Sequence, residues 1–163
     1  MIPAPPDPLN IDAAAFWLRL GTAVACGGVV GIERQLRGKA AGVRTSILIC
    51  VGTMLFVSLG EAFPSARTDP TRVLGQVITG IGFLGAGVIL AQGGKIVGVT
   101  SAAVIWMLAA LGAMIGVGFL TTAFILTLTT LAVLLGVEAM ESAWGRLRRG
   151  NVGKGLDLLE LDQ

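Results

Sequence analysis

The sequence has no histidine, no tyrosine, only two cysteines and few charged residues, which make up 13% of the chain. Histidine is the side chain best suited to acid–base chemistry near neutral pH and a common metal ligand, so its absence removes the commonest route to both. No metal-ligand cluster and no nucleophile beside a base is visible elsewhere in the sequence. We therefore do not expect an enzyme. No cofactor is expected either, and Mg²⁺ is the one ion left open.

The two cysteines, Cys26 and Cys50, both lie inside apolar runs. Two thiols in such positions supply no disulfide framework. We interpret them as small apolar fillers, and a redox or metal-binding pair is the alternative.

The shortage of charge accompanies a high apolar content. The chain of 163 residues is 54% hydrophobic with a mean hydropathy of +0.83, whereas about a quarter of the residues of a soluble domain are charged. The stretch from Ile96 to Val137 carries no charge, and its length suits two membrane helices joined by a turn. The basic residues sit in short loops rather than on one face, so nucleic-acid binding is not expected. The sequence predicts an integral membrane protein.

The pattern of apolar runs and breaks predicts an all-α fold with about five transmembrane helices. A transmembrane domain over 1–143 would be followed by a short tail over 144–163 that is first basic and then acidic. The expected spans are 13–32, 44–62, 73–92, 97–114 and 117–137.

The lysines and arginines of the connecting segments indicate the orientation. Nine of them lie around the first and third connections and in the tail, two lie around the second connection, and the N-terminal stretch and the fourth connection have none. Because cytoplasmic segments carry the excess of these residues, we expect the N-terminus outside and the C-terminus in the cytoplasm. Trp144 with the three arginines that follow it is typical of an anchor to anionic membrane lipid.

Glycines recur in the expected spans, most densely in the segment 69–90, DPTRVLGQVITGIGFLGAGVIL. Small residues let membrane helices approach each other closely. Residues 80–85 also match the dinucleotide fingerprint GxGxxG, but one uncharged helix replaces the strand, turn and acid that this motif needs. We predict helix packing, between chains as well as within one, and a permeation role is the alternative. The expected packing glycines are Gly27, Gly31, Gly80, Gly82, Gly85 and Gly87.

Charged and polar residues occur near the predicted membrane boundaries. Asp69 can cap a helix that begins at Pro70, with Arg72 and Gln76 following on its first turns. The alternative is a polar site at the outer mouth for a cation or a partner. Arg19 lies about 9 Å inside the first span at 1.5 Å per residue. Such an arginine needs to snorkel to the interface or to pair, and Asp69 is the expected partner.

At the opposite boundary, Glu33 and Arg34 close the first span. Glu33 can pair with Arg34, Arg37 or Arg44 and so clamp the first loop. The alternative is a surface that binds an anion, a lipid or a partner. If any residue holds a metal ion, Asp69 or Glu33 is the candidate, although one carboxylate beside an arginine suits Mg²⁺ poorly.

Four segments together carry a family resemblance: GGVVGIERQ at 27–35, AAGVRTSILICVGTMLF at 40–56, residues 69–90, and GVTSAAVIWMLAALGAMIGVGF at 98–119. Over about residues 15–118 the chain resembles the MgtC/SapB family of bacterial inner-membrane proteins. The resemblance implies a domain of roughly five spans and an association with growth at low magnesium and with virulence. It also implies a functional polar motif, which maps onto Glu33, Arg34, Arg44, Asp69, Arg72, Gln76 and Thr100.

The resemblance further implies a likeness to regulators, of which one is linked to restraint of the F-type ATP synthase. Longer members carry a cytoplasmic C-terminal domain, which we expect this chain to lack. We therefore predict a role in magnesium homeostasis through modulation of a membrane partner, in a homo-oligomer of the inner (plasma) membrane. The alternative is a transporter or channel for Mg²⁺ or another cation, and few intramembrane carboxylates favour the regulator.

Overall fold

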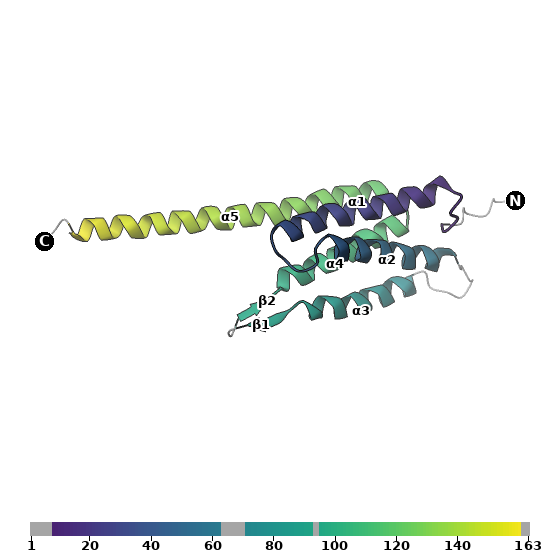
Figure 1. Cartoon of the computed structure of the whole chain (residues 1–163), viewed down its shortest axis with the longest axis horizontal. Helices are drawn as coiled ribbons and strands as arrows, with labels where there is room; N and C mark the ends of the chain where they lie inside the picture. The colour runs from purple at the N-terminus through teal and green to yellow at the C-terminus, as the bar shows by residue number, and fades with distance from the viewer. Residues whose placement is uncertain (1–7, 63–70, 93–94, 161–163) are drawn as a thin grey trace. The chain divides into compact units, whose positions relative to one another are not determined.

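A computed structural model of the chain describes residues 8–62, 71–92 and 95–160 (Figure 1). Asp69 lies outside these ranges, so the structure does not address the cap or the pairing expected of it. The chain forms two compact units, a first unit over Met1–Leu128 and a second unit over Thr129–Gln163.

The described residues form five helices and one short antiparallel hairpin, which confirms the all-α prediction. The helices are α1 (Ala14–Leu36), α2 (Val43–Ala62), α3 (Thr71–Gly87), α4 (Val99–Gly116) and α5 (Leu120–Glu160), and the strands are β1 (Leu90–Gln92) and β2 (Lys95–Val97).

Four of the described helices are long and apolar enough to cross a membrane: α1, α2, α4 and the Leu120–Met140 part of α5. Helix α3 has 17 residues, about 25 Å at 1.5 Å per residue, which is at the short end for a crossing. The direction in which the helices cross stays a prediction.

The third expected span, 73–92, ends earlier than its apolar sequence indicates. Helix α3 stops at Gly87, and the chain then forms a hairpin in which Leu90 pairs with Val97. Gly98 follows with φ of +91°, and a Cβ atom there would collide with the carbonyl oxygen of Val88. Only glycine fits this position, so the hairpin closes against the end of α3. The apolar run concealed the boundary because its hydropathy does not change there.

The core of the first unit lies between α1, α2 and α4, with α2 packed against both of the others. Its central residues are Ala23, Cys26, Cys50, Met54, Leu111, Ile115 and Ala123. Both cysteines are free and buried in this apolar cluster. Leu120–Leu128, the first part of α5, belongs to this unit and contributes Ala123 to the core.

Glycines permit the close contacts of this core. An added Cβ would lie 2.8 Å from Ser46 O at Gly27 and 2.6 Å from Val43 Cα at Gly31. At Gly116 it would lie 2.9 Å from Met54 O. Real side chains do not approach so closely, so α1 and α4 reach the backbone of α2 only because these positions carry no side chain.

The glycines of α3 have different surroundings. An added Cβ at Gly80, Gly82 or Gly87 would meet no atom of the described chain within 4 Å. Gly85 alone of the four predicted packing glycines in α3 has a neighbour, with Ala102 Cβ at 3.8 Å, an ordinary contact distance. Within one chain, α3 therefore packs against α4 without the close backbone approach expected from its sequence. Packing of its glycines against another chain stays a prediction.

Residues 117–119 connect α4 to α5. Gly118 has φ of +92°, a backbone conformation that residues other than glycine rarely adopt. In the second unit α5 continues as helix to Glu160.

Candidate functional site

Two residues of the expected polar motif, Glu33 and Arg34, lie on the last turns of α1 and are buried, with 8% and 3% of their surfaces exposed. The sequence places them there because Gly31 and Gly27, about one and two turns before Arg34, let α1 lie directly on α2. Burial of an ion pair is costly unless the pair is well hydrogen-bonded. The hydrogen bonds of these side chains therefore decide how well their burial is compensated.

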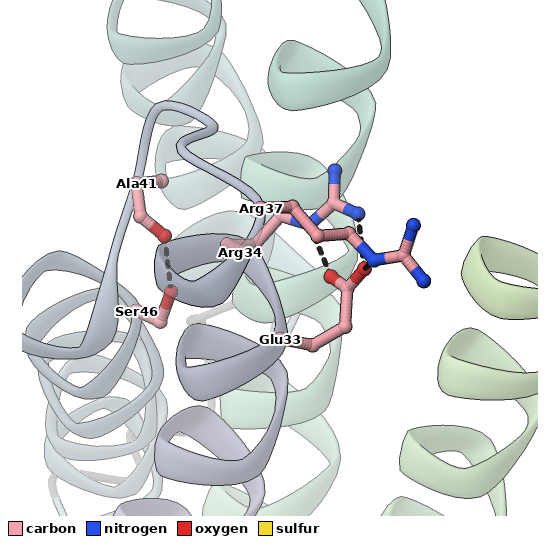
Figure 2. Close-up of polar contacts among 5 residues, drawn as sticks. All are labelled: Glu33, Arg34, Arg37, Ala41 and Ser46. Carbon is pink, nitrogen blue, oxygen red and sulfur yellow. Dashed lines mark hydrogen bonds and ion pairs between the residues drawn. The ribbon is translucent and has the colours of Figure 1, made fainter. Parts of the chain in front are cut away.

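Arg34 and Arg37 converge on the carboxylate of Glu33 (Figure 2). Arg34 donates from Nε to one carboxylate oxygen and from Nη2 to the other, the second bond measuring 2.7 Å. The Nε atom of Arg37, one turn further on and 28% exposed, lies 2.7 Å from Glu33 Oε1. Bidentate arginine–carboxylate pairs are the strong class of charged hydrogen bonds.

The cluster therefore joins one acid to two bases and has a formal charge of +1. Of the three partners expected for Glu33, the structure shows Arg34 and Arg37. Arg44 is exposed on the first turn of α2. Both ion pairs join Glu33 to residues at the end of α1, Arg34 inside the helix and Arg37 one residue beyond it, and the clamp on the first loop stays a prediction.

The loop after this cluster is held by backbone-directed bonds. The buried Ser46 hydroxyl donates to the carbonyl of Ala41 at 2.8 Å (Figure 2), and Ala41 has φ of +60°. The amide N–H of Val43 donates to Gln35 Oε1 at 3.3 Å. The first bond ties the loop to α2 and the second ties α1 to α2, so the loop and the charged cluster form one ordered end of the bundle.

Arg19 lies toward the other end of α1. Its Nη1 donates to the carbonyl of Gly116 at 2.8 Å, and the Ser58 hydroxyl donates to the same oxygen at 3.2 Å. Carbonyls of the last helical turn lack an intrahelical donor and carry the negative end of the helix dipole. The sequence predicted that Arg19 snorkels to the interface or pairs with Asp69, and it did not indicate this carbonyl acceptor. The only signal in the sequence was the end of α4 near Gly116–Gly118.

The remaining motif residues are spread over both ends of the bundle. Arg72 is exposed on the first turn of α3, and Gln76 is exposed one turn later. Thr100 is exposed on the first turn of α4, at the same end as Glu33 and Arg44, because α1 ends there and α2 and α4 begin there (Figure 1). The described motif thus divides into two groups: Glu33, Arg34, Arg44 and Thr100 at one end, and Arg72 and Gln76 near the other.

Two apolar grooves border α3. One, of about 370 Å³, lies between α2 and α3, and Thr53 and Gln76 are its polar lining residues. The other, of about 330 Å³, lies between α3, α4 and the first part of α5, and its lining includes Ile78, Trp106 and Met114. Among the described residues no group of three or more acidic, cysteine or histidine side chains could hold a metal ion together.

A family model describing the MgtC family matches residues 20–143. The chain belongs to the MgtC family. The match includes the whole expected polar motif and begins one residue after Arg19. With its long apolar helices, this membership makes the chain a membrane protein.

Relatives in several bacteria share this part of the chain. "Putative magnesium transporter YhiD" of Escherichia coli strain K12 is 42% identical over 128 residues, which cover 74% of this chain and 60% of that protein. "Protein MgtC" of Brucella suis biovar 1 is 40% identical over 124 residues, which cover 72% of this chain and 52% of that protein. The MgtC-family chain thus spans between about half and three-fifths of these relatives' length. No solved structure matches it.

Proposed function

We propose that this MgtC-family protein acts in magnesium homeostasis, or in adaptation to low Mg²⁺, by modulating a membrane partner in the bacterial inner membrane. Support comes from family membership and from the name of the YhiD relative, which refers to magnesium. The chain shares 128 residues with that relative.

One observation favours a modulator over a carrier of the ion: the carboxylate of Glu33 is occupied by two arginines. Mg²⁺ requires near-octahedral oxygen coordination and usually keeps several waters. A dication near this cluster would meet a formal charge of +1, which repels it. Glu33 therefore serves better as a structural counter-charge than as a ligand in a transport pathway.

The grooves beside α3 support the same proposal. Their walls are almost entirely apolar, which suits contact with lipid or protein better than passage of a hydrated ion. The family resemblance suggests the F-type ATP synthase as the partner to test first. We also propose that the protein works without an enzymatic activity of its own and as a homo-oligomer.

Reconstitution in proteoliposomes that contain a Mg²⁺-sensitive dye tests the proposal. We expect Mg²⁺ entry no faster than in protein-free vesicles. In inverted membrane vesicles, we expect expression of the protein to lower ATP-driven proton pumping, with vesicles that lack the protein as control. Mg²⁺ entry that Asp69→Ala abolishes would overturn the proposal.

The alternative function is transport of Mg²⁺ or another cation, which the YhiD relative's name favours. A chain with so few and such short spans would need a second copy to enclose a pathway. The proteoliposome measurement separates the two proposals directly, because only a transporter produces flux in the absence of any partner.

A further inference from the structure

The groove between α2 and α3 follows one face of α3. From α3 its lining takes Val73, Gln76, Val77, Gly80, Ile81 and Leu84, and from α2 it takes Thr53 and Phe56. The α3 positions recur at intervals of three and four residues, the spacing of a single helix face. The groove is thus a continuous strip that starts beside Arg72, at the beginning of α3.

The length of this strip matches one leaflet of a bilayer. From Val73 to Leu84 the helix rises by about 16 Å at 1.5 Å per residue. The hydrocarbon region of a typical bilayer is about 30 Å thick, so one leaflet accounts for about 15 Å. A ligand that fills the groove from the Arg72 end therefore has the reach of one lipid chain.

The width of the strip excludes a helix. With the open space at its mouth included, the groove holds about 720 Å³, which over about 16 Å gives a mean cross-section of at most about 45 Å², whereas a helix about 10 Å across needs about 80 Å². A transmembrane helix of a second copy or of another protein cannot enter this space without separating α2 from α3. A single hydrocarbon chain can enter it.

On the α3 side, polar groups occur at one end of the strip only, and Thr53 is the polar lining residue on the α2 side. Arg72, Gln76 and Gly80 follow one another at intervals of four residues along α3, and the side chains of Arg72 and Gln76 are exposed. Arginine binds phosphate through two parallel N–H bonds, and the glutamine amide is both a donor and an acceptor. This order, from cation to amide to bare apolar groove, corresponds to the phosphate, glycerol ester and acyl chain of a phospholipid.

We propose that the groove between α2 and α3 binds one acyl chain of an anionic phospholipid, with the lipid phosphate at Arg72 and the ester region at Gln76. Gly80 keeps the groove open, since an added Cβ there would meet no other side chain and would occupy the space of the acyl chain. The bound lipid completes the surface between α2 and α3, which the chain itself leaves unfilled.

Phosphatidylglycerol with a photoreactive group in its acyl chain tests the proposal on the whole protein in vesicles. We expect labelling to concentrate on Phe56 and on the α3 peptide from Val73 to Leu84. Labelling of Phe124, exposed on α5 and outside the lining of the groove, supplies the background of general lipid contact. Labelling of the groove no stronger than this background would overturn the proposal.

A matched pair of glycine variants tests the acyl chain. Gly80→Leu fills the groove, whereas Gly82→Leu places the same side chain on the same helix outside its lining. Neither added Cβ meets an atom within 4 Å, so both variants should fold. We expect Gly80→Leu to abolish the concentrated labelling and Gly82→Leu to retain it. Equal labelling of the two variants would contradict the proposal.

A matched pair of arginine variants tests the headgroup. Arg72 and Arg44 are both exposed at the second position of a helix, so Arg72→Gln and Arg44→Gln remove the same charge from comparable places. We expect Arg72→Gln to lower the preference for phosphatidylglycerol over phosphatidylcholine in the groove about fivefold, the effect of one basic residue at a membrane surface. Arg44→Gln should leave that preference unchanged. An unchanged preference in Arg72→Gln would overturn the assignment.

Discussion

Helices α1 and α3 both carry glycines at spacings typical of membrane helix packing, yet the structure uses them differently. In α1, Gly27 and Gly31 lie against the backbone of α2 so closely that no side chain would fit. In α3, Gly80 and Gly82 have open space where a side chain would be. The same residue type thus brings two helices together in one region and leaves a surface unfilled in the other.

The difference follows from the neighbours rather than from the glycines. The face of α1 that carries glycine meets Val43, Ser46 and Ile47, whose backbone atoms come into contact once no side chain intervenes. In α3, Gly80 faces a groove whose lining on the α2 side is Thr53 and the large side chain of Phe56. A glycine motif therefore shows that close approach is allowed, and the facing residues decide whether it occurs.

The largest effect in the tightly packed region is expected at its buried charges. Glu33→Gln leaves Arg34 buried with its counter-charge removed, and loss of one partner of a buried pair costs about 3–5 kcal/mol. We expect a loss of unfolding free energy at the lower end of this range, about 3 kcal/mol, because the second arginine, Arg37, is 28% exposed and is already partly solvated without Glu33. Unfolding of the purified protein in detergent, followed by circular dichroism, measures the loss. Arg44→Gln, at an exposed position, should change stability by less than about 0.5 kcal/mol. A loss in Glu33→Gln as small as that in Arg44→Gln would show that the buried pair does not stabilise the protein.

The next largest effect is expected at the contact between α1 and α2. Gly31→Ala puts a Cβ atom 2.6 Å from Val43 Cα and 3.0 Å from Ser46 Cβ, and overpacking of this kind costs about 1–3 kcal/mol. Gly28→Ala, one turn earlier, meets only the flexible end of Ile47 at 3.7 Å, so it should not destabilise the protein and can gain up to about 1 kcal/mol from higher helix propensity. The same unfolding measurement compares the two variants. A neutral Gly31→Ala would mean that α1 can move away from α2 without loss.

The sequence predicted much of the first unit because the signals for its helices and ion pairs are local. Apolar runs and their breaks located α1, α2 and the connection between α4 and α5, and the proximity of Glu33 to three bases limited its partners to a short set. Two features were hidden. The end of α3 lies inside an unbroken apolar run, and the partner of Arg19 is a backbone carbonyl at Gly116, a group that every residue carries and that no sequence pattern distinguishes.

A smaller effect is expected at the connection between α4 and α5. Gly118→Ala forces a side chain into a backbone with φ of +92° and places its Cβ 3.3 Å from Arg19 Nη2. A left-handed conformation costs a residue other than glycine about 1–2 kcal/mol, so we expect a loss of about 1.5 kcal/mol. Hydrogen exchange of the amides at 117–120 should increase more than exchange at the centre of α4. Uniform protection would indicate that the connection adapts without strain.

The smallest effect, and one of opposite sign, is expected in α3. Gly82→Ala adds a methyl group to open space and gives the helix a residue of higher intrinsic propensity, a gain of up to about 1 kcal/mol. Measured as a monomer in detergent, the variant should therefore be slightly more stable than the parent.

The sequence prediction that this glycine packs against a second chain leads to a different result in membranes, because a methyl group at a close interchain contact separates the helices. Cross-linking between copies in vesicles distinguishes the two cases: loss of cross-linked dimer in Gly82→Ala, with monomer stability retained, places a neighbouring copy on α3, whereas unchanged cross-linking leaves the glycines of α3 to the lipid.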